Sequence, residues 1–157
     1  MNNAAISTEG KPPPAWSSEA AIFALKVLDE IKRDNWELSI LFCNDKKIKE
    51  LNRQYREKDE PTDVLSFVLG ESIKENGKTT YFPGDIVISL DTLRENASNF
   101  QIPEDEELRR LLIHGILHLD GMDHITINKD EPMLILQEEI LNKLSNERII
   151  PPAGGIN

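Results

Sequence analysis

The chain has 157 residues and a formal net charge of −10, from 18 lysine and arginine and 28 aspartate and glutamate side chains. This length fits one domain with its own core, and the single cysteine, Cys43, excludes an internal disulfide. The acidic total argues against a protein that coats nucleic acid through bulk charge attraction. No apolar run has the length of a signal or transmembrane segment, so we expect a cytoplasmic protein with no membrane partner.

The charge is unevenly distributed along the chain. Residues 44–58 include six basic and three acidic side chains, whereas residues 103–147 include eleven acidic and four basic. The first segment is compatible with a local nucleic-acid-binding face and equally with an ordinary solvated helix surface. Composition leaves both interpretations open.

The first third of the chain predicts a tail and then a helix. Residues 1–16 are polar and contain three consecutive prolines, so we expect a mobile tail. From Ser17 or Ser18, a natural N-cap, apolar residues recur every three positions up to about Asn35. This spacing predicts an amphipathic helix whose inward residues are Ile22, Leu25, Leu28 and Ile31.

A strand, a helix and a second strand follow. Residues 37–43 alternate in polarity and predict a strand that buries the Cys43 thiol. Asn44 is the expected N-cap of the next helix. Residues 64–69 form a continuous apolar run, typical of a strand covered on both faces. This succession predicts a βαβ unit with parallel neighbouring strands. The inward stripe of its helix is expected to be Ile48, Leu51 and Tyr55.

Asn76-Gly77 is the strongest hairpin signal in the chain. It lies between residues 64–69 and two further extended pieces, residues 79–82 and 85–89. One strand of the sheet should therefore run antiparallel to the others.

Two helices are predicted next. Residues 91–100 form a short one, and Pro103 begins a longer one whose first turn, residues 104–107, is entirely acidic. We interpret this acidic run as a helix cap that binds nothing. The inward residues of the two helices are expected to be Leu93, Ala97 and Phe100, and Leu108, Leu111 and Leu112.

The last helix is expected over residues 128–144, with Pro132 in its first turn, and residues 149–157 should form a second flexible tail. The stripe of that helix would be Met133, Leu136, Ile140 and Leu144. The predicted fold is a single α/β (α+β) domain over residues 17–148. It has a small, mixed, mostly parallel four-stranded sheet with one antiparallel strand, surrounded by about five helices.

The three histidines of the chain all lie in the stretch HGILHLDGMDH. His114 and His118 are four residues apart, so a helix places them on one face. Gly121 can adopt a positive φ after the helix and let the chain return with His124. Three imidazoles around one point, with the fourth tetrahedral position open, are typical of a catalytic zinc site.

Each histidine taken singly could be an ordinary core residue, but their clustering favours a metal site. The spacing also fits the metzincin protease pattern, which requires a glutamate directly after the first histidine as general base. This chain has Gly115 there. Peptide hydrolysis by that mechanism would therefore lack its proton acceptor.

Three segments resemble the YbeY family of endoribonucleases. HGILHLDGMDH is similar to its histidine signature, LNRQYREKDEPTDVLSF to a second conserved stretch and GDIVIS to a third, in the same order over residues 36–144. The chain departs from the family pattern at Val68, Pro83 and Met122, and none of these is a histidine.

The resemblance implies an α/β fold and one Zn²⁺ held by His114, His118 and His124. It implies zinc-dependent cleavage of single-stranded RNA in maturation of the 3′ end of small-subunit (16S) rRNA and in ribosome quality control. The partners would be this RNA, ribosomal particles and ribosome-associated proteins, and oligomeric state leaves no trace in the sequence. His114 and Arg56 would be the catalytic residues, with the Arg56 guanidinium clamping the scissile phosphate.

Some assignments stay open. Without the resemblance, Arg56 would be interpreted as a surface ion pair with Glu57, Asp59 or Glu60. The proton acceptor is unassigned, because candidates Asp63, Asp85 and Asp123 each fit an ordinary turn or supporting role. Two other function classes remain: a different metallohydrolase, and a ribosome-assembly binding factor with a structural metal. Imidazole ligands alone do not separate zinc from nickel, copper or iron.

Overall fold

The computed structural model describes residues 1–152. Its centre is a four-stranded sheet in the order β1-β2-β4-β3. The strands β1, β2 and β4 are parallel, and β3 runs antiparallel to β4. This confirms a mixed, mostly parallel sheet with one antiparallel strand. The strands are β1 (Asn3–Thr8), β2 (Glu37–Cys43), β3 (Val64–Glu75) and β4 (Lys78–Ser89).

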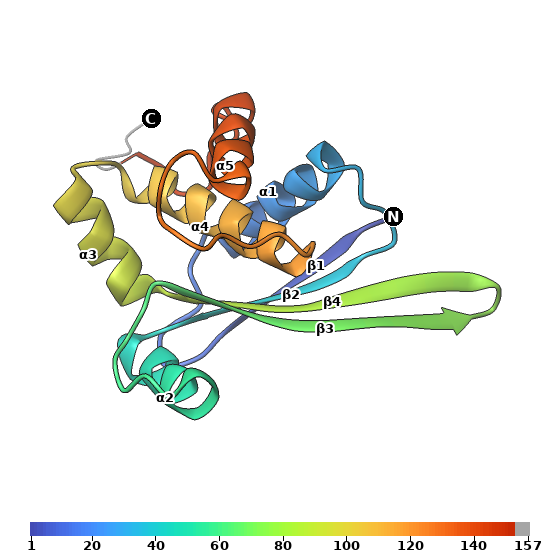
Figure 1. The fold of residues 1–157 in the computed structure, drawn as a ribbon, viewed down its shortest axis with the longest axis horizontal. Coiled ribbons are helices and arrows are strands. Elements are labelled where there is room, and N and C mark those ends of the chain that lie inside the picture. The colour runs from blue at the N-terminus through green and yellow to red at the C-terminus, as the bar shows by residue number, and fades with distance from the viewer. Residues whose placement is uncertain (153–157) are drawn as a thin grey trace.

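In the described part of the chain, residues 1–152, five helices surround the sheet in a single domain (Figure 1). In this view α1, α4 and α5 lie on one side of the sheet, α2 lies on the other, and α3 lies at one end. The helices are α1 (Ser17–Glu30), α2 (Asp45–Arg56), α3 (Leu90–Phe100), α4 (Glu104–Leu119) and α5 (Pro132–Lys143).

The alternation of side chains along the strands produces two cores. Ile86 and Ile88 of β4 pack in the larger core with residues of α1, α4 and α5. Val87, between them in sequence, packs on the opposite face with Ile48 of α2 and the thiol of Cys43. This is the two-residue period of a strand, and burial raises the pKa of Cys43 to about 12. Cys43 is therefore a core residue, as predicted.

The expected βαβ pairing is wrong. β4, not β3, is the parallel neighbour of β2, because β3 folds back on β4 and pairs with it antiparallel. The turn is formed by Asn76 (φ 51°) and Gly77 (φ 78°), and two positive φ angles are required for the tightest hairpin connection. The hairpin signal therefore overrides the crossover rule. β3 and β4 project beyond the other strands as an arm (Figure 1).

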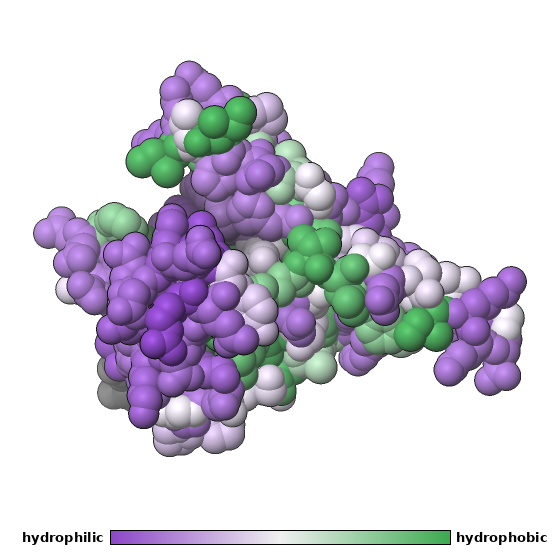
Figure 2. Space-filling model, turned by 60° about the horizontal axis from the view of Figure 1, so that its bottom comes forward, coloured by the Kyte–Doolittle hydropathy of each residue, from purple (hydrophilic) through white to green (hydrophobic). Residues whose placement is uncertain are grey.

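The arm carries exposed apolar side chains. Val68, Leu69 and Ile73 of β3 are exposed, and hydrophobic atoms are visible in the space-filling view (Figure 2). The ladder shifts register between Val68 and Glu71, where Gly70 has a positive φ of 69°. Such a bulge increases local twist and bends the strand.

The N-terminal residues are not simply a tail. Asn3–Thr8 form β1, which pairs residue by residue with Glu37–Phe42 of β2, and this corrects the expectation of a mobile segment over residues 1–16. Proline content correctly excluded a helix there, but a short edge strand needs only backbone pairing, which composition does not reveal.

Three helix residues expected to be buried are exposed. These are Ile22, Tyr55 and Phe100. In α1 the buried residues are Ala20, Phe23, Ala24, Val27 and Leu28, so the inward stripe is displaced from the one that period-three spacing predicted. A strict period of three drifts around a helix of 3.6 residues per turn.

The acidic start of α4 does more than cap the helix. Asp105 is only 2% exposed, and its Oδ1 accepts hydrogen bonds from the backbone N–H groups of Ile149 (2.7 Å) and Ile150 (2.8 Å). The interpretation of the run as a helix cap alone is therefore incomplete, because Asp105 also anchors the chain after α5. The predicted C-terminal tail begins with these two anchored residues, and residues 153–157 lie outside the described part of the chain. Within residues 1–152, no helix combines the length and apolarity needed to cross a membrane.

Candidate metal centre

His114 and His118 project from the same face of α4. Their ring centroids are 4.6 Å apart and their Nε2 atoms 3.0 Å apart. The opposite face of α4 lies on β4: a Cβ added to Gly115 would come within 2.9 Å of Ile86 Cγ2. Position 115 therefore faces the core, where a larger side chain has no room.

The helix ends so that the chain turns back toward these two rings. The N–H groups of Gly121 and Met122 donate to the carbonyl oxygens of His118 and Leu117, each at 3.0 Å, and Gly121 has the expected positive φ, 95°. This is a common way to satisfy the last carbonyl groups of a helix. The following residues bring the His124 ring to 5.3 Å from His114 and 5.6 Å from His118, measured between centroids.

The structure thus brings the three predicted histidines together. One ring nitrogen from each lies within 4.8 Å of the other two, and all three side chains are partly buried. Burial lowers the pKa of His114 and of His118 below the ordinary value of 6.5. Both imidazoles are therefore neutral at pH 7, which is the form that binds metals.

Each histidine uses Nδ1 to contact an oxygen acceptor. The partners are Gln137 Oε1 for His114 (2.6 Å), the Met122 carbonyl for His118 (3.1 Å) and the Thr126 carbonyl for His124 (2.7 Å). A carbonyl oxygen only accepts, so Nδ1 carries the proton in all three rings. In the neutral rings of His114 and His118, Nε2 then presents a lone pair. Because the His118 contact uses a backbone atom, the Met122 departure from the family pattern leaves it intact.

The close pair of Nε2 atoms is an observation that a metal ion would explain. Two lone pairs facing each other at 3.0 Å repel, unless a cation lies between them. Two nitrogens bound to one tetrahedral zinc are about 3.3 Å apart, from Zn–N bonds of about 2.0–2.1 Å. The donor set, its tautomers and its spacing therefore fit zinc.

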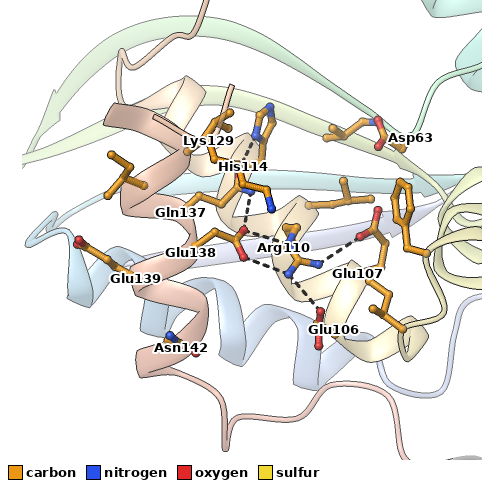
Figure 3. A pocket seen from close by; sticks show the side chains of 16 residues that line it. Asp63, Glu106, Glu107, Arg110, His114, Lys129, Gln137, Glu138, Glu139 and Asn142 are labelled. Carbon is orange, nitrogen blue, oxygen red and sulfur yellow. Dashed lines mark hydrogen bonds and ion pairs between the residues drawn. The ribbon is translucent and has the colours of Figure 1, made fainter. Parts of the chain in front are cut away.

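Gln137 is a functional residue that the sequence interpretation missed. Its Oε1 holds His114, its Nε2 donates to Glu138 (3.0 Å), and Glu138 pairs with Arg110 (3.0 Å). Figure 3 shows this chain of contacts leading from the histidine along α5 to α4. A signal was present: Gln137 occupies the inward stripe of α5, between Met133 and Ile140, and is 7% exposed. A buried polar residue needs a hydrogen-bonding partner.

Arg110 is the centre of a charged cluster beside the histidines. It contacts Glu106 (3.1 Å) and Glu107 (3.6 Å) in addition to Glu138. Burial raises the pKa of Glu107. These residues line a cavity of 1060 Å³ that also reaches His114 (Figure 3).

A second cavity of 920 Å³ is lined by all three histidines. Arg56, at the end of α2, and its neighbour Tyr55 line the same cavity. Within residues 1–152, no carboxylate lies within 4.0 Å of the Arg56 guanidinium. The predicted alternative, a surface ion pair with Glu57, Asp59 or Glu60, is therefore not formed.

The three candidate proton acceptors are in different surroundings. Asp63 lines both cavities with His114, and its carboxylate accepts from the Val64 N–H at 2.7 Å. Asp123 is 86% exposed and accepts from the backbone N–H of His124 at 2.8 Å. Asp85 lines a different groove, between α2 and the sheet. The structure therefore does not place Asp85 with the histidines.

The histidine triad beside an unpaired arginine agrees with the comparison to known families. The model of the family described as Endoribonuclease YbeY matches residues 13–145. The chain belongs to this family. The YbeY endoribonuclease of Treponema denticola is 45% identical over 150 residues, covering 94% of this chain and 97% of that protein. That of Persephonella marina is 46% identical, covering 76% and 77%.

A solved structure supports the architecture. The solution structure of TM1509 from Thermotoga maritima aligns with a TM-score of 0.64 and 30% identity, covering 92% of this chain and 90% of that one. The family membership and the α/β fold that the sequence motifs predicted are thus confirmed.

Proposed function

We propose that this protein is a metal-dependent endoribonuclease that cleaves single-stranded RNA, with one zinc ion held by His114, His118 and His124. The observation that carries the proposal is the convergence of one ring nitrogen from each of the three histidines in a cavity that Arg56 also lines. We further propose maturation of the 3′ end of small-subunit rRNA as its role in the cytoplasm, in contact with ribosomal particles, because the family resemblance implies it.

When bound in such a site, zinc supplies a Lewis acid that lowers the pKa of water and polarises a phosphoryl oxygen. The protein supplies three neutral ligands, which leave the positive charge of the ion uncompensated. Gln137 and the carbonyl groups of Met122 and Thr126 keep each ring in the tautomer that presents Nε2. This outer set of contacts also fixes ring orientation.

Arg56 binds the phosphate in this proposal. Its planar guanidinium can donate two parallel hydrogen bonds to phosphate oxygens, which an ammonium group cannot match. The absence of an ion-pair partner within residues 1–152 leaves these donors free. The exposed ring of Tyr55 in the same cavity offers a stacking surface for an unpaired base.

A protease function receives no support from position 115. Gly115 faces Ile86 and not the histidines, so the residue that carries the general base in metzincins has no equivalent here. Asp63 shares the cavity with the histidines and is the carboxylate we propose for holding a proton near the scissile bond.

The decisive experiment is cleavage of a labelled single-stranded RNA by purified protein, combined with elemental analysis and parallel incubation with casein. We expect one zinc per chain, RNA cleavage that a chelator abolishes and added zinc restores, and no casein hydrolysis. Arg56→Ala should lower kcat/KM roughly 100-fold or more, and Arg56→Lys should recover only part of it. Wild-type rates for Arg56→Ala would show that the clamp is wrong.

The rRNA role needs a separate measurement. Cells depleted of the protein should accumulate small-subunit rRNA with unprocessed 3′ ends, and the wild-type chain should restore them. If a folded His114→Ala variant restored them equally well, the protein would act by binding, with any metal in a structural role.

A further inference from the structure

The exposed surface of α2 carries a row of four cationic side chains. Lys46, Lys49, Arg53 and Arg56 follow one another at intervals of three, four and three residues, which places them along one stripe of the helix. All four are exposed. Ten residues at 1.5 Å each give the row a length of about 15 Å. We call it the α2 basic row.

Within residues 1–152, no member of the row forms an ion pair, although Glu50 lies four residues after Lys46 on the same helix. No carboxylate in this part of the chain lies within 4.0 Å of any of its four cationic groups. Asp45, in the first turn of α2, is turned away and accepts from the hydroxyl groups of Ser89 and Thr92, each at 2.6 Å. On a protein with a net charge of −10, such a row stands out. The space-filling view shows a continuous hydrophilic surface over the α2 side of the molecule (Figure 2).

Helix stability does not account for the whole row. Arg53 and Arg56 lie in the last turn, where the helix dipole favours cations. Lys46 lies in the first turn, where the same dipole disfavours positive charge. A structural explanation therefore covers only the half of the row nearest the histidines.

The C-terminal end of the α2 basic row lies in the cavity that the three histidines line. Arg56, its last member, lines the cavity with the three histidines, and Lys46, its first, is about 15 Å further along α2. The Tyr55 ring, packed edge-on against Phe67 with centroids 5.2 Å apart, stands at this end. Cationic groups that follow a backbone, next to an aromatic ring, are the usual components of a single-strand-binding groove.

We propose that the α2 basic row binds the phosphate backbone of single-stranded RNA and leads it away from the histidines for about two to three nucleotides. The proposal rests on the endoribonuclease function above and adds the path of the substrate. An acidic protein segment would need only the charges, whereas the continuity with the histidine cavity and Tyr55 favours RNA. On this proposal, residues 44–58 form a nucleic-acid-binding face and not only a solvated helix surface.

The test is the salt dependence of RNA binding. A fluorescent 12-nucleotide single-stranded RNA is titrated with full-length protein, in chelator, at several NaCl concentrations. Arg56 is left unchanged because it lies in the cavity. The triple variant Lys46→Gln/Lys49→Gln/Arg53→Gln loses three phosphate contacts. The plot of the logarithm of the association constant against the logarithm of the salt concentration should therefore become less steep, by about 2 in its slope. The Kd at low salt should rise roughly tenfold.

The matched control removes the same charge elsewhere. Lys32, Lys74 and Lys78 are exposed and lie outside α2, so Lys32→Gln/Lys74→Gln/Lys78→Gln should bind RNA as the wild type does. Equal slopes for the two triple variants would overturn the proposal, since they would mean that only net charge matters. In zinc-loaded protein, the α2 variant should lose more kcat/KM on the 12-nucleotide RNA than on a dinucleotide, which has only one nucleotide on each side of the scissile bond and cannot reach Lys46.

The outcomes separate the two proposals. If the wild-type protein cleaves RNA but the two triple variants bind RNA with equal slopes, the proposed function stands and the α2 basic row does not bind RNA. Wild-type protein that neither binds nor cleaves RNA contradicts both. If an acidic peptide binds more tightly than RNA, and the α2 triple variant loses this binding, the α2 basic row binds a protein partner. That result would overturn the proposal that the row binds RNA.

Discussion

The three histidines are held by two different kinds of structure. His114 and His118 lie on α4, a helix buried on several sides, and their neighbours Ile113, Gly115 and Leu117 are all core residues. His124 lies on a connecting loop in which Ile125 is 97% and Ile127 90% exposed. Two ligands are thus positioned by the hydrophobic core and the third by local polar contacts. We therefore expect the loop that carries His124 to have a lower free energy of local unfolding than α4.

The loop has its own anchor. The Glu131 carboxylate accepts from the backbone N–H of Ile125 (3.1 Å), from the N–H of Thr126 (2.9 Å) and from the Thr126 hydroxyl (3.0 Å). The Thr126 carbonyl in turn accepts from His124 Nδ1. These hydrogen bonds lower the pKa of Glu131. The carboxylate of Glu131, which is partly buried, therefore holds the segment of His124, as core packing holds the helix of the other two histidines.

The largest effect is expected from removing one histidine ligand, either from α4 or from the loop. His118→Ala and His124→Ala should each abolish stoichiometric zinc binding and lower RNA cleavage by about 100-fold or more, because two imidazoles do not form the site. Elemental analysis and cleavage assays measure this. The metal-free proteins should differ: only His118→Ala should lower the melting temperature, since it leaves space beside the core. Equal melting temperatures would remove the distinction between α4 and the loop.

The next effect concerns the contact that fixes His114. Gln137→Leu removes the acceptor of its Nδ1–H and should weaken zinc binding about 10- to 100-fold. Gln137→Glu retains an acceptor and should stay closer to the wild type. Competition with a chromophoric chelator measures the affinities. If Gln137→Leu bound zinc as tightly as the wild type, the contact would not position the ring.

A smaller effect, on stability, is expected where α4 meets β4. Gly115→Ala places a methyl group about 2.9 Å from Ile86 Cγ2 and should cost about 1–3 kcal/mol of unfolding free energy through overpacking. Urea denaturation measures it. Ile86→Ala should cost less in the Gly115→Ala background than alone, because it removes the Cγ2, Cδ1 and Cγ1 atoms that the new methyl group would meet. Additive costs would argue against direct contact.

The smallest effect is expected at the anchor of the loop. Glu131→Ala should weaken zinc binding several-fold, about 1 kcal/mol, because exposed hydrogen bonds contribute modestly. Asp130→Ala, at the exposed neighbouring position, is the matched control and should leave zinc affinity unchanged. Faster amide exchange at Thr126 in the first variant alone would show that the loop has been released. An unchanged rate there would mean that other contacts hold His124.

The convergence of the three histidines was predicted from the sequence, whereas the residue that holds one of them was missed. Helical spacing and a turn glycine were enough to predict that His114, His118 and His124 converge, because these are local properties of a short segment. Gln137 contacts His114 from 23 residues away, and its position in the α5 stripe was a signal that a purely apolar interpretation of that helix passed over.

By itself, the sequence determined the type of most elements, the hairpin turn, the histidine cluster and the family. These depend on periodicity, capping and backbone preferences that act over a few residues. The tertiary structure alone decided that β4 inserts beside β2, that Asn3–Thr8 join the sheet, and that Arg56 shares a cavity with the histidines. Those outcomes depend on pairing and packing between distant segments, where several arrangements satisfy the same local pattern and only the shared core selects one.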